Sequence, residues 1–332
     1  MHLPDGILSG PVVVGTGVVA AAGLGWALRR LGKEQSSGPS PVVMGMTAAF
    51  LFAAQMVNFP VLPGVSGHLL GGVLAAVLLG PWGGAVAVAA VLLVQALLFA
   101  DGGVTALGAN FVNMGLLGSA GGWLIYVSLR RRWARERGVL AAAMVAAWLS
   151  VLLSAGACAV ELAGSGRWSS LGSVLGWMLL VHAVIGVGEA LITGVVVQAL
   201  LRTRPDLIPD PDAAAAGGVG AARIQAGLAG LAVALAVAMF LGPLAWDWPD
   251  GLEWVSEKVG LKIDEQETAG LPAAMPDYQL KLPGVDSLRL ATAAAGAVGT
   301  LVVFAAAAGL GRALEARPGL AAAVVRTGGG ES

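Results

Sequence analysis

The chain contains repeated long apolar runs, and these constrain its fold more than any other feature. A helix of about 20 apolar residues spans the roughly 30 Å of hydrocarbon in a bilayer. The composition agrees, because 57% of the residues are hydrophobic, 12% are charged and the mean hydropathy is +0.81. The sequence therefore predicts an all-α, polytopic helical membrane protein. The predicted spans are 11–31, 41–59, 66–80, 83–100, 104–128, 139–163, 173–201, 224–243 and 288–311.

Basic residues fall mostly on one side of these predicted spans. Cytoplasmic loops carry an excess of Lys and Arg, and an outer N-terminus puts most of the 19 basic residues on the inner side. The inner residues are Arg29, Arg30, Lys33, Arg130, Arg131, Arg132, Arg135, Arg137, Arg202, Arg204, Arg223, Arg312, Arg317 and Arg326. The outer residues are Arg167, Lys258, Lys262, Lys281 and Arg289. We therefore expect a multi-pass plasma-membrane protein with its N-terminus outside and its C-terminus inside.

A polar stretch at 202–223 divides the chain. Its prolines, aspartates and Ala/Gly run disfavour helix and favour a flexible cytoplasmic linker. Before it, 1–201 is predicted to form a bundle of about seven segments, of which 66–80 is short and Gly-flanked and therefore a candidate for a tilted or re-entrant segment. After it, 224–332 is predicted to form a two-helix hairpin around an extracytoplasmic loop, 244–287. That loop is rich in Asp and Glu, either to attract cations or only to stay solvated.

The chain end Met1-His2 offers an unusual set of metal ligands. The α-amine, the amide nitrogen of His2 and its imidazole Nδ1 together close a five- and a six-membered chelate ring. This arrangement favours a flat field of nitrogen ligands, which suits Ni(II) and Cu(II). No cleavable signal peptide is expected, because no basic region precedes the first apolar run and Pro4-Asp5-Gly6 is typical of a turn. Initiator Met is generally kept before a bulky residue such as His, so we expect the amine of Met1 to be retained. The alternative is an ordinary start followed by a histidine without a metal role.

His68 is the predicted fourth nitrogen. It follows Ser66-Gly67 at the outer end of the third predicted span, on the same side of the membrane as Met1 and His2. A lone histidine at a helix end also serves commonly as a local hydrogen-bonding group. The match in topology nevertheless favours a metal site made of Met1, His2 and His68.

Further polar residues lie within or beside the apolar runs, where such groups are costly and usually have partners. They are predicted to hydrogen-bond between helices or loops and to orient the metal ligands, with a purely structural role as the alternative. Asp101 is expected to cap the helix that follows it. His182 and Glu189 share one helix face and are interpreted first as a structural polar pair and second as part of an ion path. The supporting residues are Asn58, Ser66, Gln95, Asp101, Asn110, Asn113, His182 and Glu189.

Four sequence blocks, in order along residues 1 to about 200, resemble the CbiM/NikM family, the substrate-binding membrane components of energy-coupling-factor transporters for cobalt and nickel. They are Met1-His2-Leu3-Pro4-Asp5-Gly6, the segment from Gln55 to Gly72 with Ser66-Gly67-His68-Leu69, the segment from Asp101-Gly102-Gly103 to Asn110, and the segment from His182 to Thr193. In the C-terminal part, Pro249-Asp250-Gly251-Leu252-Glu253 resembles the PDGLE-type small component that is encoded beside such proteins or fused to them.

The resemblance implies a square-planar site built from the amine and amide of Met1-His2, the imidazole of His2 and His68. It also implies ATP-driven import of Ni²⁺ or Co²⁺, together with a CbiQ/NikQ-like transmembrane coupling subunit and two CbiO/NikO-like ATPase subunits. The chain contains no Gly-x-x-x-x-Gly-Lys-Ser/Thr motif, so ATP hydrolysis is assigned to those partners and the chain is predicted not to be an enzyme. No bound organic cofactor and no nucleic-acid partner are expected.

Two other function classes remain as alternatives. An autonomous divalent-metal channel or secondary carrier needs no ATPase, but a site with four nitrogens holds an ion too firmly for rapid conduction. An intramembrane metalloenzyme has little support, since the chain has 3 histidines, no His-Glu-x-x-His motif and no Gly-x-Ser-x-Gly motif. A planar nitrogen field favours nickel over cobalt and copper over both, so the sequence leaves the choice between nickel and cobalt open.

Overall fold

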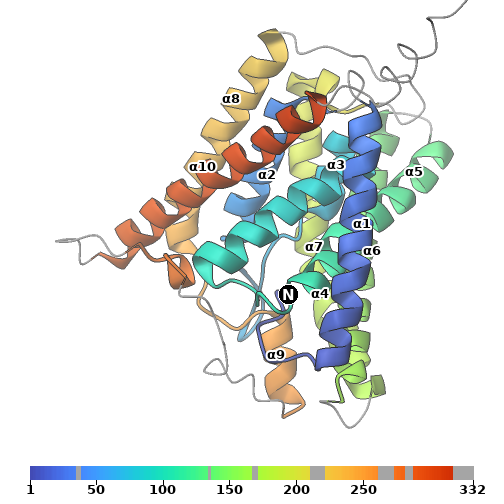
Figure 1. The fold of residues 1–332 in the computed structure, drawn as a ribbon, viewed down its shortest axis with the longest axis vertical. Helices are drawn as coiled ribbons and strands as arrows, with labels where there is room; N and C mark the ends of the chain where they lie inside the picture. Colours follow the sequence, from blue (N-terminus) through green and yellow to red (C-terminus); the bar gives the residue numbers. More distant parts are fainter. Residues whose placement is uncertain are drawn as a thin grey trace, which may run out of the picture.

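The computed structural model describes residues 1–34, 39–133, 136–166, 171–209, 221–260, 273–280 and 287–316, which are mostly helical (Figure 1). The helices are α1 (Gly10–Glu34), α2 (Pro41–Gln55), α3 (Gly72–Val94), α4 (Leu107–Asn110), α5 (Gly122–Arg132), α6 (Glu136–Gly164), α7 (Leu171–Thr203), α8 (Ala221–Ala236), α9 (Gly251–Lys258) and α10 (Leu288–Glu315). Wider π-helical turns lie at Gln95–Phe99, Phe111–Gly121 and Val237–Leu241. Single 3₁₀ turns lie at Pro205–Leu207, Gly242–Leu244 and Pro276–Tyr278.

Seven helical stretches in the described residues are long and apolar enough to cross a membrane, and α2 is a shorter apolar helix. The predicted all-α, polytopic membrane class is therefore confirmed. The seven stretches are Gly10–Lys33, Gly72–Phe99, Leu107–Arg132, Gly138–Gly164, Leu171–Thr203, Arg223–Leu244 and Leu288–Glu315.

The predicted spans 66–80 and 83–100 are two halves of one element, which bends sharply at Gly80. This glycine has φ 73° and ψ 171°, outside the helical region, and Pro81 follows it. A Cβ at Gly84 would lie only 2.8 Å from the backbone nitrogen of Ala76, so the two halves pack against each other. Small residues permit this close backbone approach in a membrane protein.

Two predicted span boundaries were wrong: the C-terminal end of the span 41–59 and the N-terminal end of the span 66–80. Helix α2 ends at Gln55 and α3 begins only at Gly72, and between them β1 (Phe59–Leu62) and β2 (Val65–Gly67) form an antiparallel hairpin. Gly64 has φ 78° at the hairpin turn, where glycine has no steric penalty. The short loop from His68 to Gly71 therefore leaves the hairpin, and it carries the predicted histidine ligand.

The C-terminal helices pack on the N-terminal part of the chain. Helices α8 and α10 both contact α2, and α10 runs diagonally across it (Figure 1). The loop that follows α8 also docks: α9 contacts α7 and β2, and Met275 N–H donates to the Leu98 carbonyl at 2.8 Å. The loop 244–287 is therefore not simply a solvated connection, although its stretches 261–272 and 281–286, with four of its nine acidic residues, lie outside the described residues.

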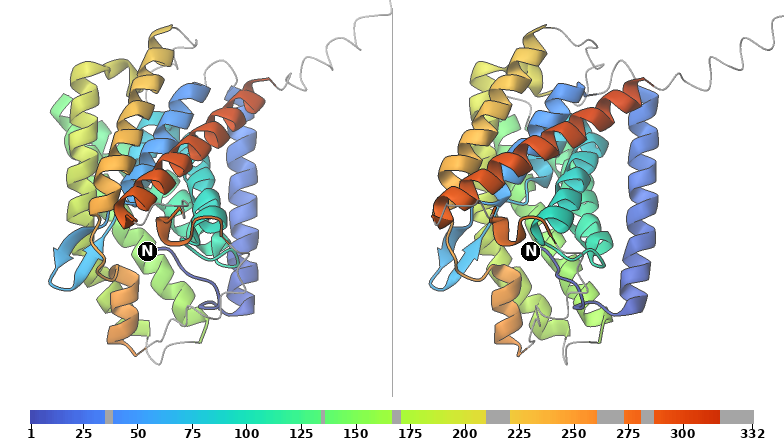
Figure 2. Two further views of the ribbon diagram at one scale, coloured as in Figure 1. Left: turned by 90° about the vertical axis from the view of Figure 1, so that its left-hand side faces the viewer. Right: turned by 60° about the vertical axis from the view of Figure 1, so that its left-hand side comes forward.

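Two ends of the bundle can be distinguished. The hairpin β1–β2 and α9 lie toward one end, and the start of α8 and the last residues of α1 and α10 lie toward the other (Figure 2). The N-terminus does not project from the molecule but returns into it, and Met1 is only 3% exposed. This arrangement brings the chain end to the loops around the hairpin.

Candidate metal-binding site

The first residues of the chain are fixed against the segment that precedes α4. The backbone N–H of Leu3 donates to Oδ1 of Asn110 at 2.8 Å, and Nδ2 of Asn110 donates to the Leu3 carbonyl at 3.1 Å. The same carbonyl accepts the N–H of Gly103 at 2.8 Å. Asn110 therefore holds the chain end by two hydrogen bonds to Leu3, and its predicted role in orienting the metal ligands stays a prediction.

Asp5 continues this docking. Its carboxylate accepts the backbone N–H of Val104 at 3.1 Å and that of Thr105 at 2.6 Å, together with the Thr105 hydroxyl. A Cβ at Gly103 would lie 2.3 Å from the backbone nitrogen of Asp5, so only glycine allows the two segments to approach so closely. The cap expected from Asp101 was wrong, because Asp5 binds the free N–H groups of this segment and α4 has no side-chain cap.

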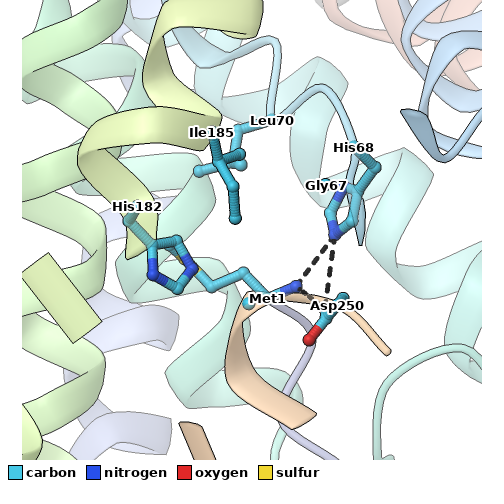
Figure 3. Close-up of a pocket in the computed structure, with 8 residues that line it drawn as sticks. Met1, Gly67, His68, Leu70, His182, Ile185 and Asp250 are labelled. Atoms are coloured by element: carbon cyan, nitrogen blue, oxygen red, sulfur yellow. Dashed lines mark hydrogen bonds and ion pairs between the residues drawn. The ribbon is translucent and has the colours of Figure 1, made fainter. Parts of the chain in front are cut away.

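The amine of Met1 meets two side chains from distant parts of the sequence (Figure 3). It lies 2.8 Å from Nε2 of His68 and forms an ion pair with Oδ2 of Asp250. The same Asp250 oxygen is 3.7 Å from Nε2 of His68. Two predicted ligands, Met1 and His68, are thus adjacent, and a carboxylate joins them.

The orientation of His68 follows from its surroundings. Its Nδ1 donates to the Leu69 carbonyl at 3.0 Å, which leaves a lone pair on Nε2 facing the Met1 amine. The carboxylate of Glu189 in α7 accepts the backbone N–H groups of Leu70 at 2.6 Å and Gly71 at 2.8 Å. Gln55 donates to the Leu70 carbonyl at 2.9 Å. The loop that presents His68 is therefore held on both sides by buried side chains.

His2 is close to His68 but only partly in position for chelation. The two ring centroids are 5.2 Å apart and the rings are inclined by 40°. Nδ1 of His2, the nitrogen that a terminal chelate uses, is hydrogen-bonded to Asp101. Among the described residues, Nε2 of His2 has no hydrogen-bond partner, and the backbone N–H of His2 makes no hydrogen bond. Chelation therefore requires Nδ1 to exchange Asp101 for the ion.

A small pocket opens beside the amine. Its lining residues are Met1, Gly67, His68, Leu70, His182, Ile185, Asp250 and Gly251 (Figure 3). Nδ1 of His182 donates to the Met178 carbonyl at 2.8 Å, whereas its buried Nε2 has no partner in the described part of the chain. The Met1 side chain points toward His182 in Figure 3, while the amine points toward His68 and Asp250.

The other predicted supporting residues have different partners. Ser66 and Asn58 bind the C-terminal part, since the Ser66 hydroxyl donates to the Trp248 carbonyl at 2.6 Å and the Asn58 carbonyl accepts the Trp246 N–H at 3.1 Å. Gln95 donates to Oε1 of Gln55 at 2.9 Å. Asn113 lies apart from the site and donates to Glu161 of α6 at 2.7 Å.

His182 and Glu189 do not act on a shared partner, although both lie on α7. His182 bonds within its own helix, and Glu189 holds the loop that follows His68. They were expected to form a structural pair. Instead, His182 lines the pocket, and Glu189 supports the loop that follows His68.

Asp250 and Tyr278 were not predicted as site residues. Asp250 is the N-cap of α9: its Oδ1 accepts the N–H groups of Leu252 at 2.7 Å and Glu253 at 2.9 Å, and Glu253 accepts the N–H of Asp250 at 2.9 Å. Tyr278 donates its hydroxyl to Asp101, which in turn holds His2. The Pro-Asp-Gly-Leu-Glu sequence indicated the capping box, but nothing local indicated that its carboxylate faces the chain end.

The electrostatics of the site favour bound positive charge. Burial would raise the pKa of Asp250, but the Met1 ammonium and His68 outweigh it and hold this pKa well below its usual range. Burial likewise opposes ionisation of Asp101, yet His2 and Tyr278 lower its pKa. For His68, burial and the Met1 ammonium both lower the pKa, which keeps the imidazole neutral and able to bind a metal. The amine thus contacts the ionised carboxylate of Asp250 and a neutral imidazole, while the carboxylate of Asp101 lies beside His2.

No group of three or more His, Cys, Asp or Glu side chains suited to a metal ion occurs within the described ranges. The donor atoms that do converge here include main-chain nitrogen as well as side chains. The amine of Met1 and the unbonded amide of His2 are such nitrogens, beside His68 and Asp250.

Comparisons with known proteins identify relatives for both parts of the chain. Residues 2–207 match the family described as "Cobalt uptake substrate-specific transmembrane region" (CbiM), and residues 225–316 match the PDGLE domain. A fused protein named NikMN from Archaeoglobus fulgidus is 36% identical, over 92% of this chain and 96% of its own length. The fused nickel transport protein NikMN of Rhodobacter capsulatus is 31% identical over 83% of each chain. The cobalt transport protein CbiM of Geobacter sulfurreducens is 33% identical, over 78% of this chain and 77% of its own.

Solved structures show the same fold for about three fifths of the chain. The crystal structure of a truncated transition metal transporter has a TM-score of 0.53 at 30% identity and covers 61% of this chain and 99% of its own. A second transition metal transporter has a TM-score of 0.54 at 29% identity, over 61% of this chain and 93% of its own. The chain therefore belongs to the CbiM family of metal-transport membrane proteins, and it carries a PDGLE domain after the CbiM region.

Proposed function

We propose that this protein is the substrate-binding component of an energy-coupling-factor transporter, which captures Ni²⁺ or Co²⁺ outside the cell for ATP-driven import. The 2.8 Å separation between the Met1 amine and Nε2 of His68 carries the proposal. Two nitrogens bound at about 2.0 Å to one metal, at a right angle, are about 2.8 Å apart. The two groups are therefore spaced as neighbouring ligands of one ion.

The proposed ligands are the amine of Met1, the amide nitrogen and Nδ1 of His2, and Nε2 of His68. Two features support the chelate on the His2 side: the backbone N–H makes no hydrogen bond among the described residues, and the ring lies next to His68. In the metal-free form Asp101 holds Nδ1, and the ion takes its place. A metal ligand must be free of its proton, so binding releases protons into the site or to solvent.

The proposed orientation puts this site on the extracytoplasmic side. The basic ends of α1, α8 and α10 lie toward the opposite end of the bundle from the hairpin and α9 (Figure 2). An excess of Lys and Arg on the cytoplasmic side agrees with this orientation. The proposed division is a metal-binding part at 1–201, a cytoplasmic linker at 202–223 and a C-terminal part at 224–332.

Energy for import would come from partner proteins. A coupling membrane subunit and two ATPase subunits complete the proposed transporter, because this sequence contains no phosphate-binding loop of the Walker type. An autonomous channel or secondary carrier is the competing function, and it differs in a single respect that can be measured: it moves metal without ATP.

Reconstituted vesicles distinguish these two functions. The full chain alone, and the chain with coupling and ATPase subunits from the same source, are each incorporated, and uptake of ⁶³Ni²⁺ and ⁵⁷Co²⁺ is followed with and without internal ATP. We expect uptake only with all subunits and ATP, and loss of that uptake in His68→Ala. ATP-independent uptake by the chain alone would contradict the proposal.

A further inference from the structure

We propose that Asp250 of the PDGLE domain supplies an oxygen ligand to the transported ion, so that the cargo site is built by both parts of the chain. The inference rests on the proposed function, since it adds a ligand to the same site. The site then offers a divalent first-row metal ion a carboxylate oxygen in addition to its nitrogen ligands.

Three donor atoms converge at one place. Nε2 of His68 lies 2.8 Å from the Met1 nitrogen and 3.7 Å from Oδ2 of Asp250, and that oxygen also contacts the Met1 nitrogen (Figure 3). Atoms with these separations can all lie about 2 Å from a single point, the usual length of a metal–nitrogen or metal–oxygen bond. An ion that binds the amine and His68 is therefore within bonding reach of Asp250.

The Asp250 carboxylate is fixed in this direction by its own loop. Oδ1 is used by the capping bonds from Leu252 and Glu253, which leaves Oδ2 for the site. Immediately before it, the Pro249 carbonyl accepts the backbone N–H of Ser66 at 2.9 Å, and the Trp248 carbonyl accepts the Ser66 hydroxyl at 2.6 Å. The strand that leads to His68 thus also positions Asp250, so the two donors keep their spacing.

A second contact brings the PDGLE domain to the other proposed ligand. Tyr278 donates to Asp101, and Asp101 holds Nδ1 of His2. The C-terminal part therefore contacts the amine of Met1 directly through Asp250. It contacts the imidazole of His2 indirectly, through Tyr278 and Asp101. A part that served only to anchor helices in the bilayer would have no need of either contact.

Charge also favours a carboxylate ligand. A divalent ion in a buried site is stabilised by nearby negative charge, since the interaction is much stronger there than in water. Imidazole and amine nitrogens are neutral when they bind, and the deprotonated amide of His2 supplies one negative charge. A carboxylate offsets the remaining positive charge of a divalent ion. Ligand sets that mix nitrogen and oxygen are typical of Ni(II) and Cu(II), so a carboxylate beside the nitrogen ligands fits a nickel site.

The test compares Asp250→Asn with wild type in the purified full chain. Asparagine is a good N-cap, so α9 keeps its start, but its amide nitrogen is no metal ligand. Asp247→Asn is the matched control, because Asp247 is an exposed carboxylate of the same loop. His68→Ala reports on the proposed nitrogen site. Circular dichroism and gel filtration check that each variant is folded.

Two measurements are made on each variant: the dissociation constants of Ni²⁺ and Co²⁺ by titration calorimetry, and the nickel K-edge absorption spectrum of the loaded protein. We expect Asp250→Asn to weaken both metals at least tenfold and to change the nickel spectrum from that of a five-ligand shell with oxygen to that of a planar nitrogen shell. Asp247→Asn should match wild type in both.

An unchanged spectrum in Asp250→Asn would overturn the inference, whether or not the affinity falls, because a fall alone shows only that Asp250 anchors the amine. A different result would refute the proposed nitrogen site itself: wild type would bind neither metal, or His68→Ala would bind as tightly as wild type.

Discussion

The carboxylate of Glu189, in α7, accepts the backbone N–H of Leu70 at 2.6 Å, two residues beyond His68. A second bond from Gly71, at 2.8 Å, completes the pair. Both Glu189 and Leu70 are buried. A helix of the bundle interior thus sets the position of the loop that offers the histidine ligand.

Replacement of Glu189 by alanine should weaken both folding and metal binding. Two buried N–H groups would lose their acceptor, at a cost of about 1–3 kcal/mol each in the free energy of unfolding. Displacement of His68 should lower the nickel affinity about 10- to 100-fold, as for other residues that orient ligands. Glu189→Gln, which keeps one acceptor oxygen, should fall between alanine and wild type.

Glu161→Gln is the control for this variant, since Glu161 lies on α6 and bonds Asn113 away from the site. Calorimetric titration with Ni²⁺ and thermal unfolding of each variant give the two readouts. Wild-type nickel affinity in a folded Glu189→Ala protein would contradict the positioning role.

Asn110 and Asn113 form a natural matched pair, because they are neighbours in sequence with different partners. Asn110→Ala removes both bonds to Leu3 and should release the chain end, so the nickel dissociation constant should rise at least tenfold. Asn113→Ala removes a bond to Glu161 and should leave nickel binding within about twofold of wild type. Equal effects of the two changes would show that Asn110 has no particular role at the site. Titration calorimetry measures both.

Gly103→Ala should displace the N-terminal segment. The new Cβ would lie 2.3 Å from the backbone nitrogen of Asp5 and 2.5 Å from its carboxylate. Rotation of the Asp5 side chain cannot remove the clash with the backbone nitrogen. Overpacking of this kind costs about 1–3 kcal/mol, and the metal affinity should fall with it. Gly15→Ala in α1 is the control, since nothing lies within 4 Å of the added carbon. Nickel titration and thermal unfolding are measured for both; two indistinguishable variants would refute the close-packing argument.

Acid should destabilise the metal-free protein through His68. Burial and the Met1 ammonium lower the pKa of this histidine below its ordinary value of 6.5. Below about pH 6.5 the unfolded chain therefore binds a proton that the folded chain does not, and stability falls as the pH falls further, down to the folded-state pKa. Asp101 and Asp250, whose pKa values are also lowered, add a loss of stability at still lower pH.

The measurement is the Tm of the metal-free protein between pH 8 and pH 5, compared with His68→Gln. We expect a smaller decrease of Tm between pH 7 and pH 5 in the variant, because glutamine does not titrate. Parallel curves for the two proteins would mean that His68 does not contribute to the pH dependence.

The sequence predicted those features that depend on local pattern. Apolar runs indicated the membrane helices, although 66–80 and 83–100 were predicted as separate spans and belong to one bent element. Met1, His2 and His68 were predicted to meet, and the structure brings the amine and His68 within 2.8 Å. The four-nitrogen site itself stays a prediction.

Other features depend on contacts between distant segments, which no local pattern encodes. Asp101 has the position of a helix cap, but it binds His2 and Tyr278 instead, 99 and 177 residues away along the chain. Asp250 was visible as part of a motif, yet its position beside Met1 results from the docking of the C-terminal part on the hairpin. The hairpin was not predicted, although Pro63-Gly64 is a turn signal between its two strands.

The most direct test of the metal site is a titration of Ni²⁺ and Co²⁺ into the wild-type chain and into a variant with one glycine added before Met1. The added glycine moves the free amine away from His68, while every other residue and the net charge stay the same. Loss of binding in the extended variant, as in His68→Ala, is the result that the terminal chelate predicts. Unchanged binding in the extended variant would contradict it, because the amine of Met1 would then not be a ligand.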